Sequence, residues 1–105
     1  MRIKHCIIVK FKKDVEKPSR EEIRALFSNA LTIEGIHALR DYENVIARDN
    51  RYDLLIELEM EEEALPAYDE SIWHKQWKAD YGHLIEQKTI IDLEAEPVTT
   101  TKPLA

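Results

Sequence analysis

The sequence predicts a small α+β domain whose elements follow the order β-α-β-β-α-β. Three observations carry this prediction: alternating strand patterns at residues 2–12 and 52–60, an amphipathic helical pattern at 19–31, and an aromatic-rich helical stretch at 69–85 that precedes a last strand at 88–94. A chain in this order forms a four-stranded antiparallel sheet with both helices on one face.

Length and composition allow one domain, which we place at residues 1–95, followed by a flexible C-terminal tail at 96–105. The hydrophobic content of 44% and charged content of 34% are typical of a water-soluble chain, and no apolar run is long enough to span a membrane. The start reads directly into a strand pattern, and a single cysteine cannot form an internal disulfide. We therefore expect a cytoplasmic protein.

The net charge of −6 is unevenly distributed along the chain. Residues 1–51 carry 11 Lys+Arg against 8 Asp+Glu, and residues 52–105 carry 4 against 13. Neither half of the sequence concentrates basic residues, so we expect no nucleic-acid and no membrane partner.

The first strand has one apolar face that contains a histidine, and one mixed face. The apolar face is Ile3, His5, Ile7, Val9 and Phe11, and the mixed face is Lys4, Cys6, Ile8, Lys10 and Lys12. The apolar face should meet the helices, whereas Cys6 and Ile8 indicate that the mixed face is covered too.

The first helix should begin at Ser19, which can cap it, with Glu22 reaching back to complete a capping box. One apolar stripe follows at helical spacing: Ile23, Leu26, Phe27, Ala30 and Leu31. Gly35 is a natural end to this segment.

Two strands should come next, an edge strand at 36–47 and a core strand at 52–60. In the core strand one face is Tyr52, Leu54, Ile56, Leu58 and Met60, while the other carries glutamates. These glutamates could pair with the lysines of the first strand if the two strands are neighbours. The helical region beyond should break and restart at residues 69–71, with an apolar face formed by Trp73, Trp77, Tyr81, Leu84 and Ile85.

A four-stranded sheet with helices on one face leaves its other face open. That face would expose Cys6, Ile8, Leu55 and either Ile90 or Ile91. The economical solution for this ferredoxin-like arrangement is a homodimer in which two sheets pair face to face.

With this order of elements, the chain resembles the stress-responsive A/B barrel (Dabb) family of the dimeric α+β barrel superfamily. The resemblance is carried by residues 3–12, by Tyr52-Asp53-Leu54, by Ala67-Tyr68 followed by His74, and by residues 90–93. It implies two sheets that close into a barrel across a dimer, with a small pocket between sheet and helices in each subunit.

Family function is heterogeneous, and one member is a plant polyketide cyclase. The positions that resemble its two catalytic histidines and a supporting tyrosine are His5, His74 and Tyr68, so the resemblance implies these as catalytic residues. Two further polar positions of the cyclase fall on Phe27 and Leu54, where hydrocarbon replaces the polar groups.

The candidate ligand pocket comprises Phe27, Tyr52, Leu54, Trp73, Trp77 and Tyr81, an aromatic lining that would suit a flat apolar molecule. Each candidate also has a structural interpretation. His5 could be a core histidine satisfied by one hydrogen bond or an acid/base group in a pocket, and Tyr68 could pack or orient a carbonyl oxygen. His74 could face His5 or solvent.

Other chemistry has little support in the sequence. The four histidines show no metal-ligand spacing, Cys6 lies in phase with the mixed face, and the two glycines form no phosphate loop. We therefore expect no metal and no cofactor.

Three functions remain open. The first is a homodimer that binds a small, mostly apolar molecule and transfers a proton on a carbonyl compound; whether it is an enzyme stays undecided. The second is a non-catalytic structural or assembly protein related to stress. The third, from the wider superfamily, is a cofactor-independent or haem-related monooxygenase.

Overall fold

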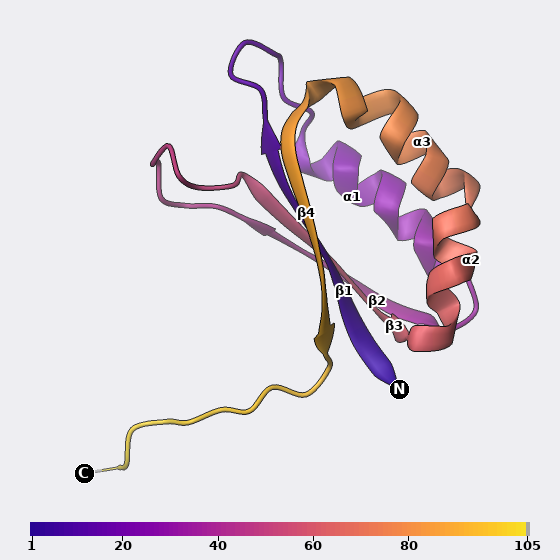
Figure 1. Ribbon diagram of the computed structural model, residues 1–105, viewed down its shortest axis with the longest axis vertical. Helices are drawn as coiled ribbons and strands as arrows, with labels where there is room; N and C mark the ends of the chain where they lie inside the picture. The colour runs from indigo at the N-terminus through magenta and orange to yellow at the C-terminus, as the bar shows by residue number, and fades with distance from the viewer. Residues whose placement is uncertain (105) are drawn as a thin grey trace.

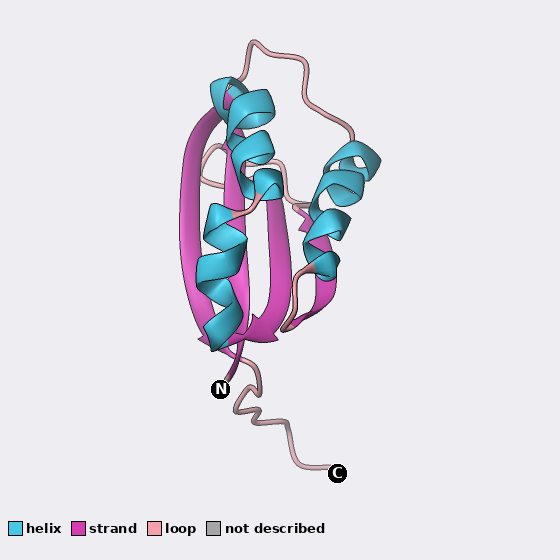
Figure 2. Cartoon of the chain, turned by 90° about the vertical axis from the view of Figure 1, so that its right-hand side faces the viewer, coloured by secondary structure: helices cyan, strands magenta, loops and turns pink. Residues whose placement is uncertain are grey.

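The computed structural model describes residues 1–104 and consists of one four-stranded antiparallel sheet with helices on one face (Figure 1). The strands are β1 (Arg2–Phe11), β2 (Ile36–Glu43), β3 (Leu54–Glu61) and β4 (Ile85–Glu94). The helices are α1 (Arg20–Ser28), α2 (Leu65–Glu70) and α3 (Ile72–Tyr81), with 3-10 turns at Asn29–Thr32, Glu62–Ala64 and Gly82–Leu84. The predicted order of elements is confirmed, and Figure 2 shows the helices side by side over the sheet.

β1 lies inside the sheet, whose strand order is β2-β3-β1-β4. The helix-facing side of β1 is buried along its whole length, and the same is true of β3 from Leu54 to Met60. The expected apolar faces of both strands are therefore confirmed, and β2 is the edge strand that its charges indicate.

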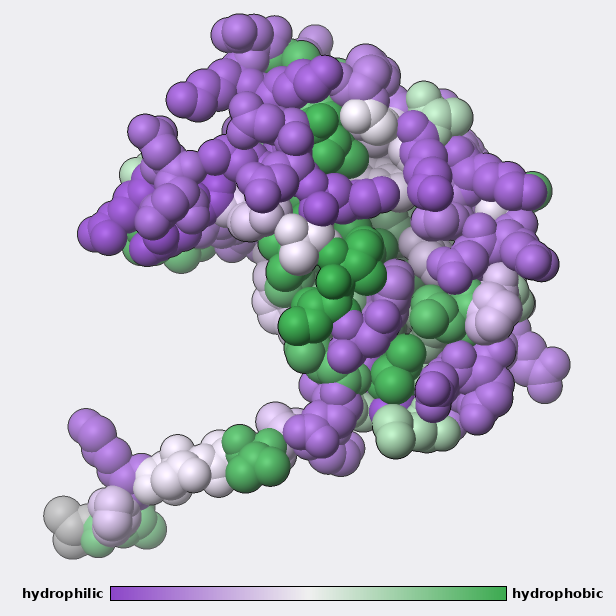
Figure 3. Space-filling model, viewed as in Figure 1, coloured by the Kyte–Doolittle hydropathy of each residue, from purple (hydrophilic) through white to green (hydrophobic). Residues whose placement is uncertain are grey.

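The register of β4 decides which side chains lie on the open face. Ile7 pairs with Ile90 and Cys6 pairs with Ile91, so Ile91 lies on the open face and Ile90 on the helix side. Ile91 is 44% exposed and Leu93 is 42% exposed. Figure 3 shows hydrophobic surface along the sheet between the loops above and the tail below.

α1 begins as the sequence predicts, because Ser19 Oγ accepts a hydrogen bond from the Glu22 backbone nitrogen at 3.0 Å. The reciprocal half of the capping box is absent: the Glu22 carboxylate instead accepts from the Tyr81 hydroxyl at 2.5 Å. The apolar stripe does not extend to Leu31 as the helical spacing predicts, since the helix tightens into a 3-10 turn at Asn29–Thr32 and leaves Leu31 43% exposed.

Gly35 ends the helical segment with a φ of 92°, a conformation that a side chain would strain. A Cβ at this position would also lie 3.0 Å from the Ala64 side chain. The tight entry into β2 therefore depends on glycine.

Two arginines of α1 hold the helix on the edge strand through Asp41 of β2. Arg24 donates to both carboxylate oxygens of Asp41 at 2.7 and 3.1 Å, and Arg20 donates to the carboxylate and to the Asp41 carbonyl oxygen. The Arg24 hydrogen bond, together with Arg20, outweighs burial and lowers the pKa of Asp41 to about 2.

The glutamates on the open face of β3 have partners other than those expected. β3 and β1 are neighbours, yet Arg40 of β2 binds Glu57 at 2.7 Å and Glu59 at 3.1 Å, and Arg2 reaches Glu59 at 3.4 Å. The expected lysine–glutamate pairs are thus replaced by arginine pairs, because the longer guanidinium side chains can span two carboxylates.

Two strand boundaries differ from the sequence prediction. β3 begins at Leu54 instead of Tyr52, and β4 begins at Ile85 instead of Lys88, so Ile85 pairs with Phe11 in the sheet instead of extending the helix. The break in the second helical region is confirmed at Ser71, whose Oγ accepts from the His74 backbone nitrogen at 3.2 Å and caps α3.

Beyond β4 the chain runs away from the body as an extended segment to Leu104 (Figure 1). The predicted flexibility of this tail stays a prediction, and its last residue, Ala105, lies outside the described residues. Among residues 1–104, none of the helices is long and apolar enough to cross a bilayer.

Candidate functional site

His5 lies on the helix-covered face of β1 and forms a hydrogen bond with β4. Its Nδ1 is 2.6 Å from Oδ1 of Asp92, the residue directly opposite in the β1–β4 register. A carboxylate can only accept, so Nδ1 carries a proton and donates it. In the neutral ring, Nε2 then holds the lone pair, which is the arrangement of a histidine base oriented by a carboxylate.

Tyr68 of α2 lies between the two candidate histidines. Its ring centroid is 5.5 Å from that of His5 and 5.0 Å from that of His74. The three residues that the resemblance implies as catalytic are therefore neighbours in space, although β1, α2 and α3 supply one each.

The Tyr68 hydroxyl is buried and has no hydrogen-bond partner among residues 1–104. The side chain is only 1% exposed. Burial first, and the charge of Asp69 second, raises the pKa of Tyr68 well above its usual value, so the hydroxyl stays protonated. An unpaired buried hydroxyl costs about 1–3 kcal/mol, which a bound acceptor oxygen would relieve.

His74 lies in the first turn of α3 and is half-buried. Its Nδ1 is 2.9 Å from the backbone carbonyl oxygen of Asp69, which can only accept. Nδ1 of His74 therefore also carries a proton. When neutral, both histidines have Nε2 as their free basic nitrogen, and both rings neighbour the Tyr68 ring.

The aromatic residues expected to line the pocket form core packing. Phe27 and Trp77 meet edge to face at 4.9 Å and are both buried, and Trp77 contacts Tyr81 at 5.3 Å. Burial first, then the hydrogen bond to Glu22, raises the pKa of Tyr81 to about 12. Trp73 is half-buried on α3. Phe27 and Trp77 belong to the same buried cluster as Tyr68.

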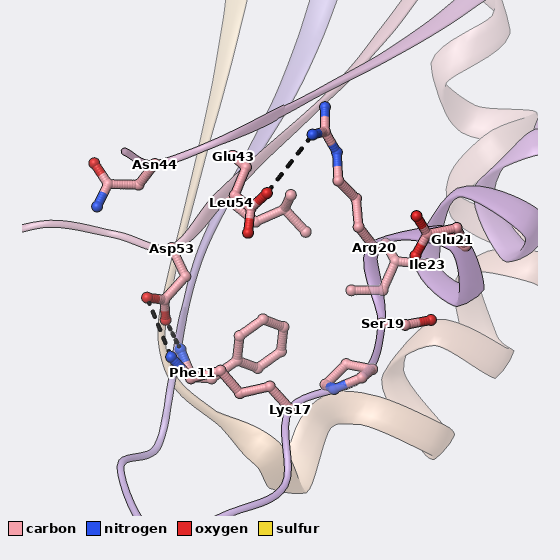
Figure 4. A pocket seen from close by; sticks show the side chains of 11 residues that line it. Phe11, Lys17, Ser19, Arg20, Glu21, Ile23, Glu43, Asn44, Asp53 and Leu54 are labelled. Atoms are coloured by element: carbon pink, nitrogen blue, oxygen red, sulfur yellow. Dashed lines mark hydrogen bonds and ion pairs between the residues drawn. The ribbon is translucent and has the colours of Figure 1, made fainter. Parts of the chain in front are cut away.

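A hollow of about 610 Å³ lies at another place, between the N-terminus of α1 and the adjoining ends of β1, β2 and β3 (Figure 4). Polar and charged side chains form most of its lining, and its apolar residues are Phe11, Pro18, Ile23 and Leu54. Leu54 is thus the one expected pocket residue found in it, and the three candidate catalytic residues do not line it.

Tyr52 differs from its expected position on the core face. It precedes the regular part of β3 and lines a hollow of about 240 Å³ with Ile8 and Leu55, two residues of the open face. Its hydroxyl bonds to the Thr89 hydroxyl at 2.8 Å. The strand alternation that placed Tyr52 beside Leu54 does not extend to it.

Within residues 1–104, no cluster of three or more histidine, cysteine, aspartate or glutamate side chains is arranged to hold a metal ion. Cys6 is buried on the open face, and burial, followed by the charges of Glu57 and Asp92, raises the pKa of its thiol. A raised pKa disfavours the thiolate, the nucleophilic form of cysteine.

Asp92 is the residue of this site that the sequence interpretation missed. It stands in the last strand beside Ile91, where an acidic residue looks like ordinary strand polarity. The register between the two strands would have identified it. In an antiparallel β1–β4 pair with Ile7 opposite Ile90, His5 must lie opposite Asp92.

The sheet order, the helices on one face and the histidine on β1 define a ferredoxin-like α+β protein. The chain belongs to the Dabb family, the stress responsive A/B barrel domain, whose family model matches residues 3–95. A comparison with curated protein sequences finds no match.

Solved structures share the fold at low sequence identity. A dimeric ferredoxin-like protein of unknown function from Thermobifida fusca is 15% identical with a TM-score of 0.73, covering 89% of this chain and 90% of its own. A protein from Arabidopsis thaliana is 23% identical with a TM-score of 0.68, covering 93% and 99%. A hydroxynitrile lyase from Passiflora edulis is 11% identical with a TM-score of 0.69, covering 97% of each chain.

Proposed function

We propose that this protein is a homodimer that binds a small, mostly apolar carbonyl compound beside Tyr68 and moves a proton on it. The observation that carries the proposal is the buried Tyr68 hydroxyl without a partner, placed between two histidines. The single cysteine, expected to be reduced, agrees with a cytoplasmic location.

The three side chains have complementary parts in such a reaction. The Tyr68 hydroxyl donates a hydrogen bond to the carbonyl oxygen and stabilises the negative charge that develops there. Nε2 of neutral His5 accepts the proton from the adjacent carbon, while Asp92 holds Nδ1 and stabilises the imidazolium that forms. Nε2 of His74 is a second base close to the Tyr68 ring.

A ligand must enter past α2, because His5 and Tyr68 are buried in the closed structure. α2 has only six residues, between a 3-10 turn and the break at Ser71. Short helical segments with such ends open locally at low cost compared with global unfolding. We infer that α2 moves outward to admit the ligand.

The dimer is proposed from the open face of the sheet. Ile91, Leu93 and Tyr42 are each more than 40% exposed there, and Ile8 and Leu55 are half-buried beside them. Two identical faces of this kind would cover each other in a two-fold dimer. The Thermobifida fusca relative, which has this fold, is described as dimeric.

The test is native mass spectrometry of the protein as purified, compared with the variants His5→Ala and His83→Ala. His83 is an exposed histidine outside the site and serves as the matched control. We expect a small molecule to be retained by the wild type and by His83→Ala and lost from His5→Ala. Equal retention by all three proteins would place the ligand elsewhere.

A non-catalytic structural role is the second candidate, and one observation favours it. Phe27, Trp77 and Tyr68 pack between sheet and helices, and the hollow of about 610 Å³ is not lined by His5. A wild-type protein that retains no small molecule and accelerates no proton exchange would support this role.

A further inference from the structure

Five cationic side chains gather around one hollow at the end of the sheet opposite α2. Lys10 comes from β1, Lys13 and Lys17 come from the loop after it, and Arg48 and Arg51 come from the β2–β3 loop. The hollow has a volume of about 250 Å³. Figure 3 shows the hydrophilic surface over these two loops. The sequence disperses these residues through its first half, and folding brings them together.

The positive charge of this basic hollow is only partly neutralised. Asp49 and Asp53 are the acidic residues among its lining, against five cations. Lys17 is 3.6 Å from Asp53, and Lys10 is 3.8 Å from Glu86. Lys13, Arg48 and Arg51 have no ion pair among residues 1–104. A local excess of cations on a chain of net charge −6 is a binding feature for an anion.

The basic hollow adjoins the larger hollow of Figure 4. Phe11, Lys17 and Asp53 line both. The larger hollow is mostly polar: it adds the carboxylates of Glu21 and Glu43, while its apolar residues Ile23 and Leu54 are almost fully buried. The cationic groups of the basic hollow are therefore the part of this region that can recognise an anion.

This site is separate from the Tyr68 site. Lys10 and His5 are five residues apart on β1, which corresponds to roughly 17 Å at 3.3 Å per residue. A small molecule in one site does not touch the other. The inference is thus independent of the proposed proton transfer.

We propose that the basic hollow binds the phosphate of a phosphate monoester. The phosphate lies among Arg48, Arg51 and Lys13. A phosphate monoester fits better than a carboxylate because it carries up to two negative charges and three acceptor oxygens, which arginine side chains bind in pairs.

The test is calorimetric titration of the full chain with octyl phosphate, octanoate and inorganic phosphate, with backbone amide NMR shifts to locate each ligand. Octyl phosphate is expected to bind about tenfold or more tighter than octanoate, because its phosphate carries more negative charge and one more acceptor oxygen, and inorganic phosphate should compete for the same site. The largest shifts should fall at residues 10–17 and 48–54.

Two double variants with the same change of net charge test whether the basic hollow is the binding site. Arg48→Glu/Arg51→Glu reverses two cations of the basic hollow, and Lys75→Glu/Lys102→Glu reverses two exposed lysines outside it. The first variant should weaken octyl phosphate about tenfold or more, while the second should change its affinity less than about twofold.

Four results would overturn the proposal. These are absence of saturable octyl phosphate binding, equal affinity for octanoate, equal weakening by both variants, and shifts centred on His5 and Tyr68. Octyl phosphate binding that His5→Ala leaves unchanged would support it, and this result would hold even if the Tyr68 site proved inactive.

Discussion

The Tyr68 hydroxyl is the feature that distinguishes a ligand-binding site from ordinary core packing. A phenol placed only for packing usually keeps its hydroxyl in water or bonded to a neighbour. This hydroxyl does neither among the described residues, although the rings of His5 and His74 both neighbour its ring. His5 in turn is fixed by Asp92, so the local geometry favours a ligand oxygen as the missing partner.

Replacing Tyr68 with phenylalanine should therefore stabilise the ligand-free protein while it weakens ligand binding. Removing an unpaired buried hydroxyl is expected to raise the free energy of unfolding by about 1 kcal/mol. Urea unfolding monitored by circular dichroism measures this change. Tyr81→Phe is the control and should be neutral or destabilising, because the Tyr81 hydroxyl donates to Glu22. A destabilised Tyr68→Phe would mean that the hydroxyl has a partner in the ligand-free protein.

At the level of secondary structure, α1 and α2 differ in how they are attached to the sheet. α1 is held at two places, by Asp41 between Arg20 and Arg24 on one side and by Glu22 with Tyr81 on the other. α2 is held by the packing of Tyr68 and Leu65 against the core and ends at Ser71. The outward motion of α2 that we infer for ligand entry would leave α1 in place.

Asp41→Asn should loosen α1 and lower the free energy of unfolding by roughly 1–2 kcal/mol near neutral pH, allowing for solvent around the arginines. The pKa of Asp41 is about 2 in the folded protein against 3.8 for the free side chain. Its contribution is therefore present above about pH 4 and is lost as the pH falls toward 2.

Urea unfolding of the wild type and of Asp41→Asn between about pH 2 and pH 4 tests this pH dependence. The stability difference between wild type and Asp41→Asn should shrink as the pH falls through the range between the two pKa values. A difference that stays constant with pH would contradict the assignment to the charged carboxylate.

Much of the fold can be predicted from the sequence, because the spacing of apolar residues indicates which segments form strands and helices and which of their faces are buried. The buried faces of β1 and β3, the Ser19 cap and the restart at Ser71 all follow from local pattern. Leu31 and Tyr52 do not, because helix tightening and the end of a regular strand depend on neighbouring elements.

The candidate site, like the fold, could be predicted from the sequence only in part. The resemblance implied His5, Tyr68 and His74, which the fold brings together. Asp92 and the basic hollow could not be identified from local pattern. Asp92 requires the register between the first and last strands, and the hollow requires two loops to meet. Contacts between segments distant in sequence are the part that periodicity does not encode.

For the whole molecule, the proposed dimer predicts that charge on the open face separates the subunits. Light scattering at micromolar concentration should give twice the chain mass of 12.3 kDa for the wild type. Ile91→Lys/Leu93→Lys should give the single chain mass, because like charges would face each other across the two-fold axis. Ile72→Lys, on the exposed side of α3, is the control and should remain a dimer. A wild-type mass of one chain would contradict the dimer.

Hydrogen–deuterium exchange of a simple ketone measures directly whether the Tyr68 site transfers protons on a carbonyl compound. Acetophenone in D₂O loses its methyl proton signal as the α-carbon is deprotonated, which proton NMR follows without knowledge of the natural ligand. We expect faster exchange with the wild type and with His83→Ala than with His5→Ala or Tyr68→Phe. Exchange at the same rate with all four proteins would contradict the proposed proton transfer.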